Sequence, residues 1–173
     1  MSSTKTLYVL RHATTQNHGA SGDKSRHLAP TGIKEADALG QFMVKNKYLP
    51  SVALCSSAIR TRETLETLNA HLNITDIRHL DILYSGSTGD YLYEIQQVHD
   101  DHDNILIVAH NPCIYELVIL LAAQGDDAVL QKASLGYSPA SLSVIECVCD
   151  KWEDIQPVIN TLLNLVNPSD YNS

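Results

Sequence analysis

The stretch Leu7–Gln16, LYVLRHATTQ, begins as a run of apolar residues and ends on an arginine beside a histidine. Its apolar part, about residues 6–10, predicts a buried β-strand, because a strand covered on both faces is apolar at successive positions. Small polar residues follow at once, so the strand ends where Arg11 and His12 begin. Either these two side chains lie on the surface after a strand, or the strand serves to present them.

Apolar runs and helical patterns alternate along the rest of the chain. This alternation predicts an α/β fold with a mostly parallel central sheet flanked by helices. We expect further strands at residues 51–55, 77–80, 104–110 and 140–148, and a short last strand after the DKW segment at 150–152. We expect helices from Pro30 onward, at 58–72, at 88–99, at 112–123 and at 157–166. No repeat or linker interrupts the pattern, so we predict a single domain over residues 1–173.

Composition excludes several classes of function. The net charge of -8 argues against a nucleic-acid or anionic-membrane surface. No apolar run is long enough to span a bilayer, and the first residues lack the apolar core of a signal peptide. The cysteines lie in apolar stretches without zinc-binding or CxxC spacing, which indicates reduced core residues of a cytoplasmic protein. They are Cys55, Cys113, Cys147 and Cys149.

Polar side chains follow three of the predicted strands. The first strand delivers Arg11 and His12, and the second leads into Arg60 at the start of a helix. The strand NILIVAH ends on His110, and Asn111 follows as a candidate helix cap and a candidate substrate-binding residue. Ligands of open α/β sheets bind beyond the carboxyl ends of the strands. We therefore expect these side chains to meet at one edge, beside helix N-termini that favour anions.

This combination of residue types suits phosphoryl transfer through a phosphohistidine. A neutral imidazole nitrogen can attack phosphorus and later leave. Arginines and a second imidazole can hold the charge of the phosphoryl oxygens, so neither a metal nor a cofactor is required. Each residue taken alone has a simpler interpretation: a chance Arg-His pair, a structural histidine at a strand end, and a cation at a helix start. The arginine at the helix start is unfavourable next to the helix dipole unless an anion lies between them.

Four ordered segments resemble the motifs of the histidine phosphatase superfamily, and in particular its short SixA-type phosphohistidine phosphatases. They are LYVLRHA (7–13), DKSRHLAPTGIKEA (23–36), ALCSSAIRTRETLE (53–66) and ILIVAHNP (105–112). The likeness extends to about Pro168, so it covers nearly the whole chain. It implies the histidine phosphatase fold, in which a mostly parallel sheet is the middle layer of a three-layer sandwich.

The resemblance also implies roles for individual residues. His12 resembles the nucleophile that becomes phosphorylated, and Arg11 and Arg60 look like the phosphate-binding arginines. His110 looks like the second histidine of the pocket. Arg26 matches the arginine of an RPLT segment in this branch, which implies either contact with phosphate or a role in pinning the loop.

The chain departs from the family at three positions. Ala13 replaces a glycine found in many relatives, and Asn17 falls one residue too early to match the phosphate-binding asparagine of the mutase branch. No acidic residue clearly matches the general acid of the larger branches, and we expect Asp90 and Glu94 to be solvated helix residues. An alkoxide leaving group needs a proton from an acid, whereas an imidazole leaves with little help. The missing acid therefore favours a phosphohistidine substrate.

We predict a metal-independent phosphatase that acts on phosphohistidine in a partner protein, such as a phosphotransfer domain. We expect a monomer that binds neither nucleic acid nor membrane. Two alternatives are a phosphatase of small phosphate esters and a non-catalytic phosphoprotein-binding module, although the intact His12 argues against the second. A metal site around His99 and His102, in VHDDHDN at 98–104, is a further alternative to a polar helix end and loop. We expect Trp152 to serve in packing.

Overall fold

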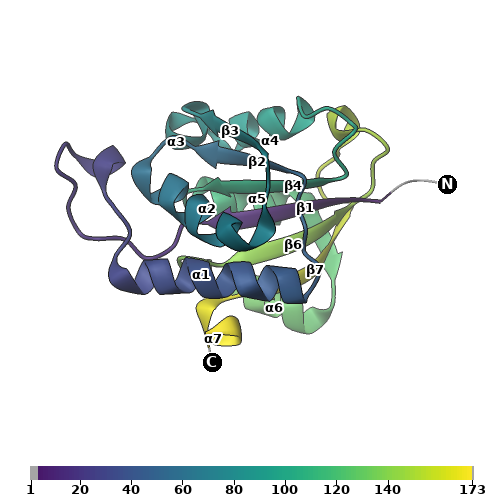
Figure 1. The fold of residues 1–173 in the computed structure, drawn as a ribbon. Coiled ribbons are helices and arrows are strands. Elements are labelled where there is room, and N and C mark those ends of the chain that lie inside the picture. The colour runs from purple at the N-terminus through teal and green to yellow at the C-terminus, as the bar shows by residue number, and fades with distance from the viewer. Residues whose placement is uncertain (1–3, 173) are drawn as a thin grey trace.

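The computed structural model describes residues 4–172, which form a sheet with helices on both faces (Figure 1). The strands are β1 (Lys5–Arg11), β2 (Val52–Ser56), β3 (Asp76–Leu80), β4 (Asn104–Ala109), β5 (Ala122–Gly125), β6 (Leu142–Cys147) and β7 (Asn160–Val166). The helices are α1 (Pro30–Lys45), α2 (Ile59–Leu72), α3 (Ile82–Ser85), α4 (Thr88–Gln96), α5 (Cys113–Leu121), α6 (Asp127–Ser134) and α7 (Pro168–Tyr171). Two 3₁₀ turns are η1 (Asp23–Ser25) and η2 (Trp152–Asp154).

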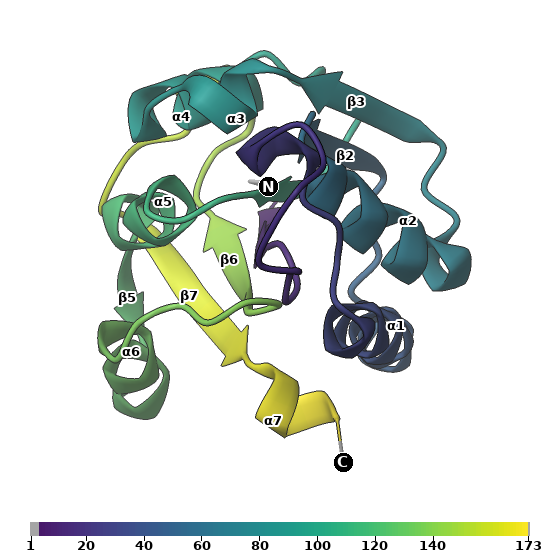
Figure 2. The ribbon, with the colours of Figure 1, turned by 90° about the vertical axis from the view of Figure 1, so that its left-hand side faces the viewer.

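The strands lie in the order β3-β2-β4-β1-β6-β7-β5. β3, β2, β4 and β1 are parallel to one another, β6 is antiparallel to both β1 and β7, and β5 is parallel to β7. The predicted α/β fold with a mostly parallel sheet is therefore confirmed. Helices α1 and α2 cover one face of the parallel strands, and α3, α4 and α5 lie on the other side (Figure 2).

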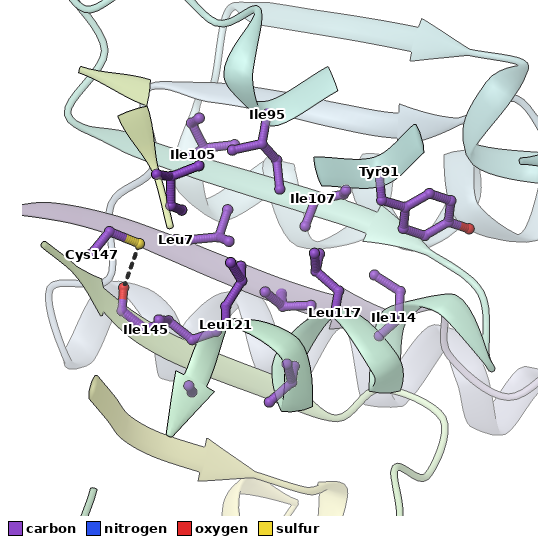
Figure 3. Packing of buried hydrophobic residues seen from close by; sticks show 14 of the residues in the cluster. Leu7, Tyr91, Ile95, Ile105, Ile107, Ile114, Leu117, Leu121, Ile145 and Cys147 are labelled. Carbon is purple, nitrogen blue, oxygen red and sulfur yellow. Dashed lines mark hydrogen bonds between the residues drawn. The ribbon is translucent and has the colours of Figure 1, made fainter. Parts of the chain in front are cut away.

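Two apolar cores separate these layers. Leu7 and Ile107 face α4 and α5, where they join the cluster seen in Figure 3. Their neighbours Tyr8 and Leu106 face α1 and α2 instead. Successive side chains of a strand point to opposite faces of the sheet. A strand covered on both sides must therefore be apolar at each position, which is why β1 and β4 were recognisable. Trp152 is fully buried in the first core, as predicted.

The predicted helix at 157–166 is wrong, because Asn160–Val166 form strand β7. The spacing of Leu162 and Leu165 suggested a helix, since residues three apart share a helix face. In the structure the pairing of β7 with β6 is irregular, and Leu163 is the residue left without a partner. This extra residue places Leu162 and Leu165 in the same core although both belong to a strand.

Other boundaries near the C-terminal half also differ from the predictions. The predicted helix at 112–123 ends at Leu121, and Ala122–Gly125 form the short strand β5. No β-branched or aromatic residue marks this strand, so nothing in its composition favoured it. Helix α6 was not predicted. The short strand expected after 150–152 is wrong, because the 3₁₀ turn η2 lies there and β7 begins only at Asn160.

Two expectations drawn from composition can be compared with the structure. All four cysteines are free; Cys55, Cys147 and Cys149 are buried, whereas Cys113 is only half-buried. Among residues 4–172 there is no helix with the length and apolar character needed to cross a membrane.

Candidate active site

The neighbouring parallel strands β2, β4 and β1 end at the same edge of the sheet, and the residues that follow them surround one cavity. This cavity, which we call the strand-end pocket, has a volume of about 350 Å³. Its lining consists of Arg11, His12, Thr14, Thr15, Asn17, Arg26, Arg60, His110, Asn111 and Pro139. All six candidate site residues from the sequence therefore lie around one cavity. A larger hollow of about 470 Å³ beside α1 and α7 contains neither histidine nor arginine and lacks the groups for phosphoryl transfer.

His12 follows β1 directly and is only 8% exposed. Its Nδ1 lies 2.8 Å from the carbonyl oxygen of Ala13. Because a carbonyl oxygen can only accept a hydrogen bond, Nδ1 carries the hydrogen and Nε2 keeps a free lone pair. The pKa of His12 is lowered to about 4, mainly by burial and also by the nearby charges of Arg60 and Arg11, while the hydrogen bond with Ala13 works in the opposite direction. At neutral pH the ring is therefore an uncharged nucleophile.

The loop after His12 is held by two helices. The backbone N–H of Ala13 donates to Thr64 Oγ1 on α2 at 3.1 Å. The backbone N–H and the hydroxyl of Thr14 both donate to the carboxylate of Glu35 on α1, each at 2.9 Å. Side-chain acceptors on the helices thus fix the backbone on the loop side of the nucleophile.

His110 follows β4, and its ring centroid lies 5.3 Å from that of His12. Ser56 Oγ, at the end of β2, is 2.7 Å from His110 Nε2 and accepts a 3.4 Å hydrogen bond from the N–H of Ala58. The serine hydroxyl hydrogen is then free to point at Nε2, which leaves the ring hydrogen on Nδ1. Burial, followed by the charge of Arg60, lowers the pKa of His110 to about 3. The ring is therefore neutral and its Nδ1–H is a hydrogen-bond donor.

The two arginines at the pocket are held by main-chain and carboxylate oxygens. Arg11 donates from one terminal nitrogen to the carbonyl of Tyr137 at 2.8 Å. Arg60 donates to the carbonyl of Asp23 at 2.7 Å and to its carboxylate at 3.0 Å. The Nε of each arginine and the Nδ1 of His110 are buried and have no partner within residues 4–172. Three donors thus remain for a bound group that supplies acceptors, as a phosphoryl group does.

Asp23 is a residue of this site that the sequence did not reveal. It lies in η1, and its carboxylate also accepts hydrogen bonds from Arg26 at 3.1 Å and from the hydroxyl of Tyr84 at 3.1 Å. Partial burial works to raise the pKa of Asp23, but the hydrogen bonds from Arg26 and Arg60 outweigh it and hold this pKa below its ordinary value. The carboxylate therefore stays ionised and is a poor proton donor. It is also the anion that compensates Arg60 at the N-terminus of α2.

Arg26 lines the strand-end pocket and at the same time pins its loop. Its Nε donates to the carbonyl of Gln16 at 2.9 Å, and a terminal nitrogen donates to the hydroxyl of Thr15. Arg26 therefore pins the loop, as one of its two predicted roles requires, and contact between Arg26 and phosphate stays a prediction.

Asn111 lies at the pocket, but it does not cap α5. The helix begins at Cys113 with Pro112 at its N-cap and has no side-chain cap, so the predicted cap and the predicted helical position of Pro112 are wrong. Instead, Asn111 Nδ2 donates to the carbonyl of Tyr137 at 3.0 Å. This hydrogen bond holds the side chain at the Tyr137 carbonyl, and Asn111 Oδ1 accepts no hydrogen bond from the N–H groups of the helix.

Neither of the two acidic residues considered as a general acid reaches the strand-end pocket. Asp90 accepts a hydrogen bond from the backbone N–H of Ser87 at 2.7 Å and forms the capping box of α4. Glu94 belongs to the same helix and is absent from the lining of the strand-end pocket.

The segment at 98–104 does not gather its side chains around one point. His102 lies 3.2 Å from the carboxylate of Asp76 and 2.9 Å from the hydroxyl of Ser51, whereas His99 pairs with Asp101 at 3.2 Å. Within residues 4–172, no three His, Cys, Asp or Glu side chains are close enough together to hold a metal ion.

Comparison of the sequence with known proteins shows the family of the chain. The profile of the histidine phosphatase superfamily (branch 1) matches residues 7–91. The uncharacterised protein Rv1276c of Mycobacterium tuberculosis is 33% identical over 151 residues, which cover 86% of this chain and 92% of that protein. The chain belongs to the histidine phosphatase superfamily, and it is a phosphatase.

Within the superfamily, the structure is similar to SixA proteins. The candidate phosphohistidine phosphatase SixA of Nakamurella multipartitia superposes with a TM-score of 0.79 at 28% identity, covering 96% of this chain and 97% of that one. The protein histidine phosphatase SixA complexed with tungstate has a TM-score of 0.78 at 18% identity, covering 95% and 98%, and shares the fold.

Proposed function

We propose that the protein removes the phosphoryl group from a phosphohistidine of a partner protein, with His12 as the residue that is transiently phosphorylated. The observation that carries this proposal is the lining of the strand-end pocket. It contains two histidines and three arginines and no aspartate or glutamate among the residues that the structure describes. The carboxylate that contacts the pocket arginines, that of Asp23, is ionised.

In the first step, the lone pair of His12 Nε2 attacks phosphorus and the bond from phosphorus to the substrate nitrogen breaks. Its electron pair goes to that nitrogen. If the substrate ring enters protonated on its other nitrogen, it leaves as neutral imidazole and needs no acid. Phosphorylated His12 is then itself a ring with hydrogen on Nδ1, held by Ala13. Arg11, Arg60 and His110 supply the donors for the phosphoryl oxygens.

An ester places a different demand on the same pocket. Its leaving group departs as an alkoxide unless an acid protonates it in the transition state, and a positioned acid contributes typically about 10²–10⁴-fold. Asp23 is poorly suited to this task because its pKa is lowered. We therefore infer that phosphoramidates and activated aryl phosphates are turned over much faster than sugar phosphates. A phosphotransfer domain in the cytoplasm, met by a monomeric enzyme, is the partner that we propose.

The test is a comparison of kcat/KM for three substrates: a protein carrying phosphohistidine, a phosphotyrosine peptide and a sugar phosphate. We expect the phosphohistidine protein to be preferred over the sugar phosphate by at least about 10²-fold, the lower end of what a general acid supplies. The His12→Asn variant serves as the control for contaminating phosphatases. A preference for the sugar phosphate would defeat the proposed substrate, and phosphate release without any phosphorylated His12 would defeat the mechanism.

A further inference from the structure

The strand-end pocket contains one buried acceptor among its donors. Asn111 Nδ2 donates to the carbonyl of Tyr137 at 3.0 Å. That carbonyl can only accept, so the orientation of the amide is fixed and Oδ1 is directed away from Tyr137. Asn111 Oδ1 is buried and has no partner within residues 4–172, although Asn111 lines the pocket.

A phosphoryl group cannot satisfy this oxygen. Its unprotonated oxygens are acceptors, and they match the unpaired donors of Arg11, Arg60 and His110. The buried Asn111 Oδ1 instead requires a group that carries hydrogen, because a buried acceptor without a donor costs about 1–3 kcal/mol. A bound state that satisfies all four of these atoms therefore brings a donor into the pocket together with the phosphoryl group.

We propose that Asn111 Oδ1 accepts a hydrogen bond from the water molecule that hydrolyses phosphorylated His12. This inference rests on the proposed function, because it assigns the second step of the same cycle. A departing imidazole carries its hydrogen across the ring from the nitrogen that held phosphorus. A water molecule carries its hydrogens on the attacking oxygen itself, which makes it the better match for an acceptor beside the phosphoryl group.

The step balances without a general base. The water oxygen forms a bond to phosphorus while the bond from phosphorus to His12 Nε2 breaks, and its electron pair returns to Nε2. His12 is left neutral with its hydrogen still on Nδ1, bound to Ala13. Both hydrogens of the water leave on the product as dihydrogen phosphate, which then equilibrates with solvent. Asn111 orients the water and accepts no proton.

Tyr137 gives this assignment a structural basis. Its carbonyl accepts hydrogen bonds from both Asn111 and Arg11, the latter at 2.8 Å. One oxygen therefore positions Asn111, which carries the acceptor Oδ1, together with an arginine of the pocket. Its hydroxyl donates to the carbonyl of Val9 at 2.6 Å, within the strand that ends just before His12. The acceptor is thus tied to the strand that carries the nucleophile.

The experiment separates the two half-reactions with p-nitrophenyl phosphate, an activated phosphoryl donor that does not depend on the identity of the protein substrate. Rapid mixing measures the first release of p-nitrophenol, and quenching followed by mass spectrometry measures phosphorylated His12. For Asn111→Ala we expect hydrolysis of the phosphoenzyme to slow about 10-fold or more, the size of one hydrogen bond, while its formation changes less than about 3-fold. Phosphorylated His12 should therefore accumulate.

Asn164→Ala is the matched control. Asn164 lies on β7 and is absent from the pocket lining, and its amide donates to the hydroxyl of Tyr48 at 3.1 Å. It should leave both rates unchanged. If Asn111→Ala slows both half-reactions equally, or slows only formation, Asn111 acts as a tether and the inference is overturned. If the wild-type protein hydrolyses p-nitrophenyl phosphate without phosphorylating His12, the proposed mechanism fails as well. Failure on a phosphohistidine protein alone removes only the proposed substrate.

Discussion

Charged side chains gather at both ends of β1, and the two groups differ in how completely they are paired. At the amino end, Lys5 is only 1% exposed, and its ammonium group donates to the carbonyls of Asp100 and His102 and to the carboxylate of Asp103. The same ammonium group lies 5.4 Å from the centre of the Trp152 ring. Each hydrogen of this buried cation has an acceptor.

At the carboxyl end the buried groups are left incomplete. The Nε atoms of Arg11 and Arg60, Nδ1 of His110 and Oδ1 of Asn111 have no partner in the part of the chain that the structure describes. Buried polar groups that satisfy one another stabilise a fold, whereas groups left unsatisfied cost free energy unless something binds them. We call the group around Lys5 the amino-end pole and the group around Arg11, Arg60, His110 and Asn111 the carboxyl-end pole. The difference in pairing indicates that the amino-end pole stabilises the fold and that the carboxyl-end pole receives a ligand. Substitutions at the two poles should therefore affect different quantities.

The largest effect is expected for His12→Asn, which removes the nucleophile. Turnover of p-nitrophenyl phosphate should fall by at least about 10⁴-fold, the scale seen when a covalent nucleophile is lost. The free energy of unfolding, followed by the fluorescence of the single tryptophan Trp152, should change far less than the activity, because the ring makes one hydrogen bond, to the carbonyl of Ala13. Residual turnover of a tenth of the wild-type rate would show that another group attacks phosphorus.

The two buried histidines at the carboxyl end of β1 should make the stability of the protein depend on pH. An unfolded chain protonates its histidines near pH 6.5, whereas burial lowers the pKa of His12 to about 4 and that of His110 to about 3 in the folded protein. Between these values the unfolded state binds more protons, so the free energy of unfolding falls as the pH is lowered from about 6.5. The fall ends near the folded pKa values, and at 1.36 kcal/mol per pKa unit it corresponds to about 3 kcal/mol for His12 and about 5 kcal/mol for His110.

Urea unfolding at a series of pH values between 7 and 4 measures this fall. His110→Asn removes one of the two groups and should flatten the curve. Equal slopes for the wild type and His110→Asn would mean that the ring is not kept neutral by the fold.

The sequence predicted the pocket because most of its main residues lie at or just after the end of a buried strand. Arg11 is the last residue of β1, His12 follows it, and His110 follows β4. Parallel neighbouring strands bring such positions to one edge of the sheet. Asp23 and Tyr137 were not predicted, because neither follows a strand. Asp23 reaches the site through its carboxylate, and Tyr137 reaches it through its main-chain carbonyl. A main-chain carbonyl has no signature in a sequence, so its role can only be seen in coordinates.

The fold was also predictable in one part and not in the other. Strands covered on both faces, such as β1 and β4, were predicted from their continuous apolar runs. On the antiparallel side of the sheet β5 and β7 were not predicted, since β5 is four residues long and β7 contains an irregularity at Leu163. A single extra residue in a strand changes which side chains share a face, and periodicity alone then favours a helix.

At the amino-end pole, Lys5→Met should reduce stability and leave the chemistry alone. The methionine fills a similar space but leaves two carbonyls and the carboxylate of Asp103 without their donor, at a cost of about 1–3 kcal/mol. Thermal unfolding measures the loss, and kcat per folded molecule should be unchanged. A drop in kcat at a temperature where the variant is folded would show that the two poles are coupled.

Ser56→Ala should have a smaller effect on the rate, because it acts through His110. Without the hydroxyl, Nε2 of His110 loses its donor, and the ring no longer needs to keep its hydrogen on Nδ1. We expect kcat/KM to fall about 10-fold, the value of one hydrogen bond. Nitrogen NMR of labelled histidine reports the tautomer directly. An unchanged tautomer with a reduced rate would assign Ser56 a packing role, and Ser56→Thr, which keeps a hydroxyl, should restore part of the activity.

The smallest effect is expected from a metal chelator. The histidines of the amino-end pole already have partners: His102 lies against Asp76 and Ser51, and His99, which is 75% exposed, pairs with Asp101. Their side chains point to separate neighbours, so they offer no shared coordination sphere. Turnover in EDTA, and turnover of His99→Ala, should both stay within about 2-fold of the wild type, below the effect of a single hydrogen bond. A loss of activity in EDTA that added zinc or magnesium reverses would mean that a cation joins the arginines in holding the phosphoryl group, and the contrast between the two poles would then have to be redrawn.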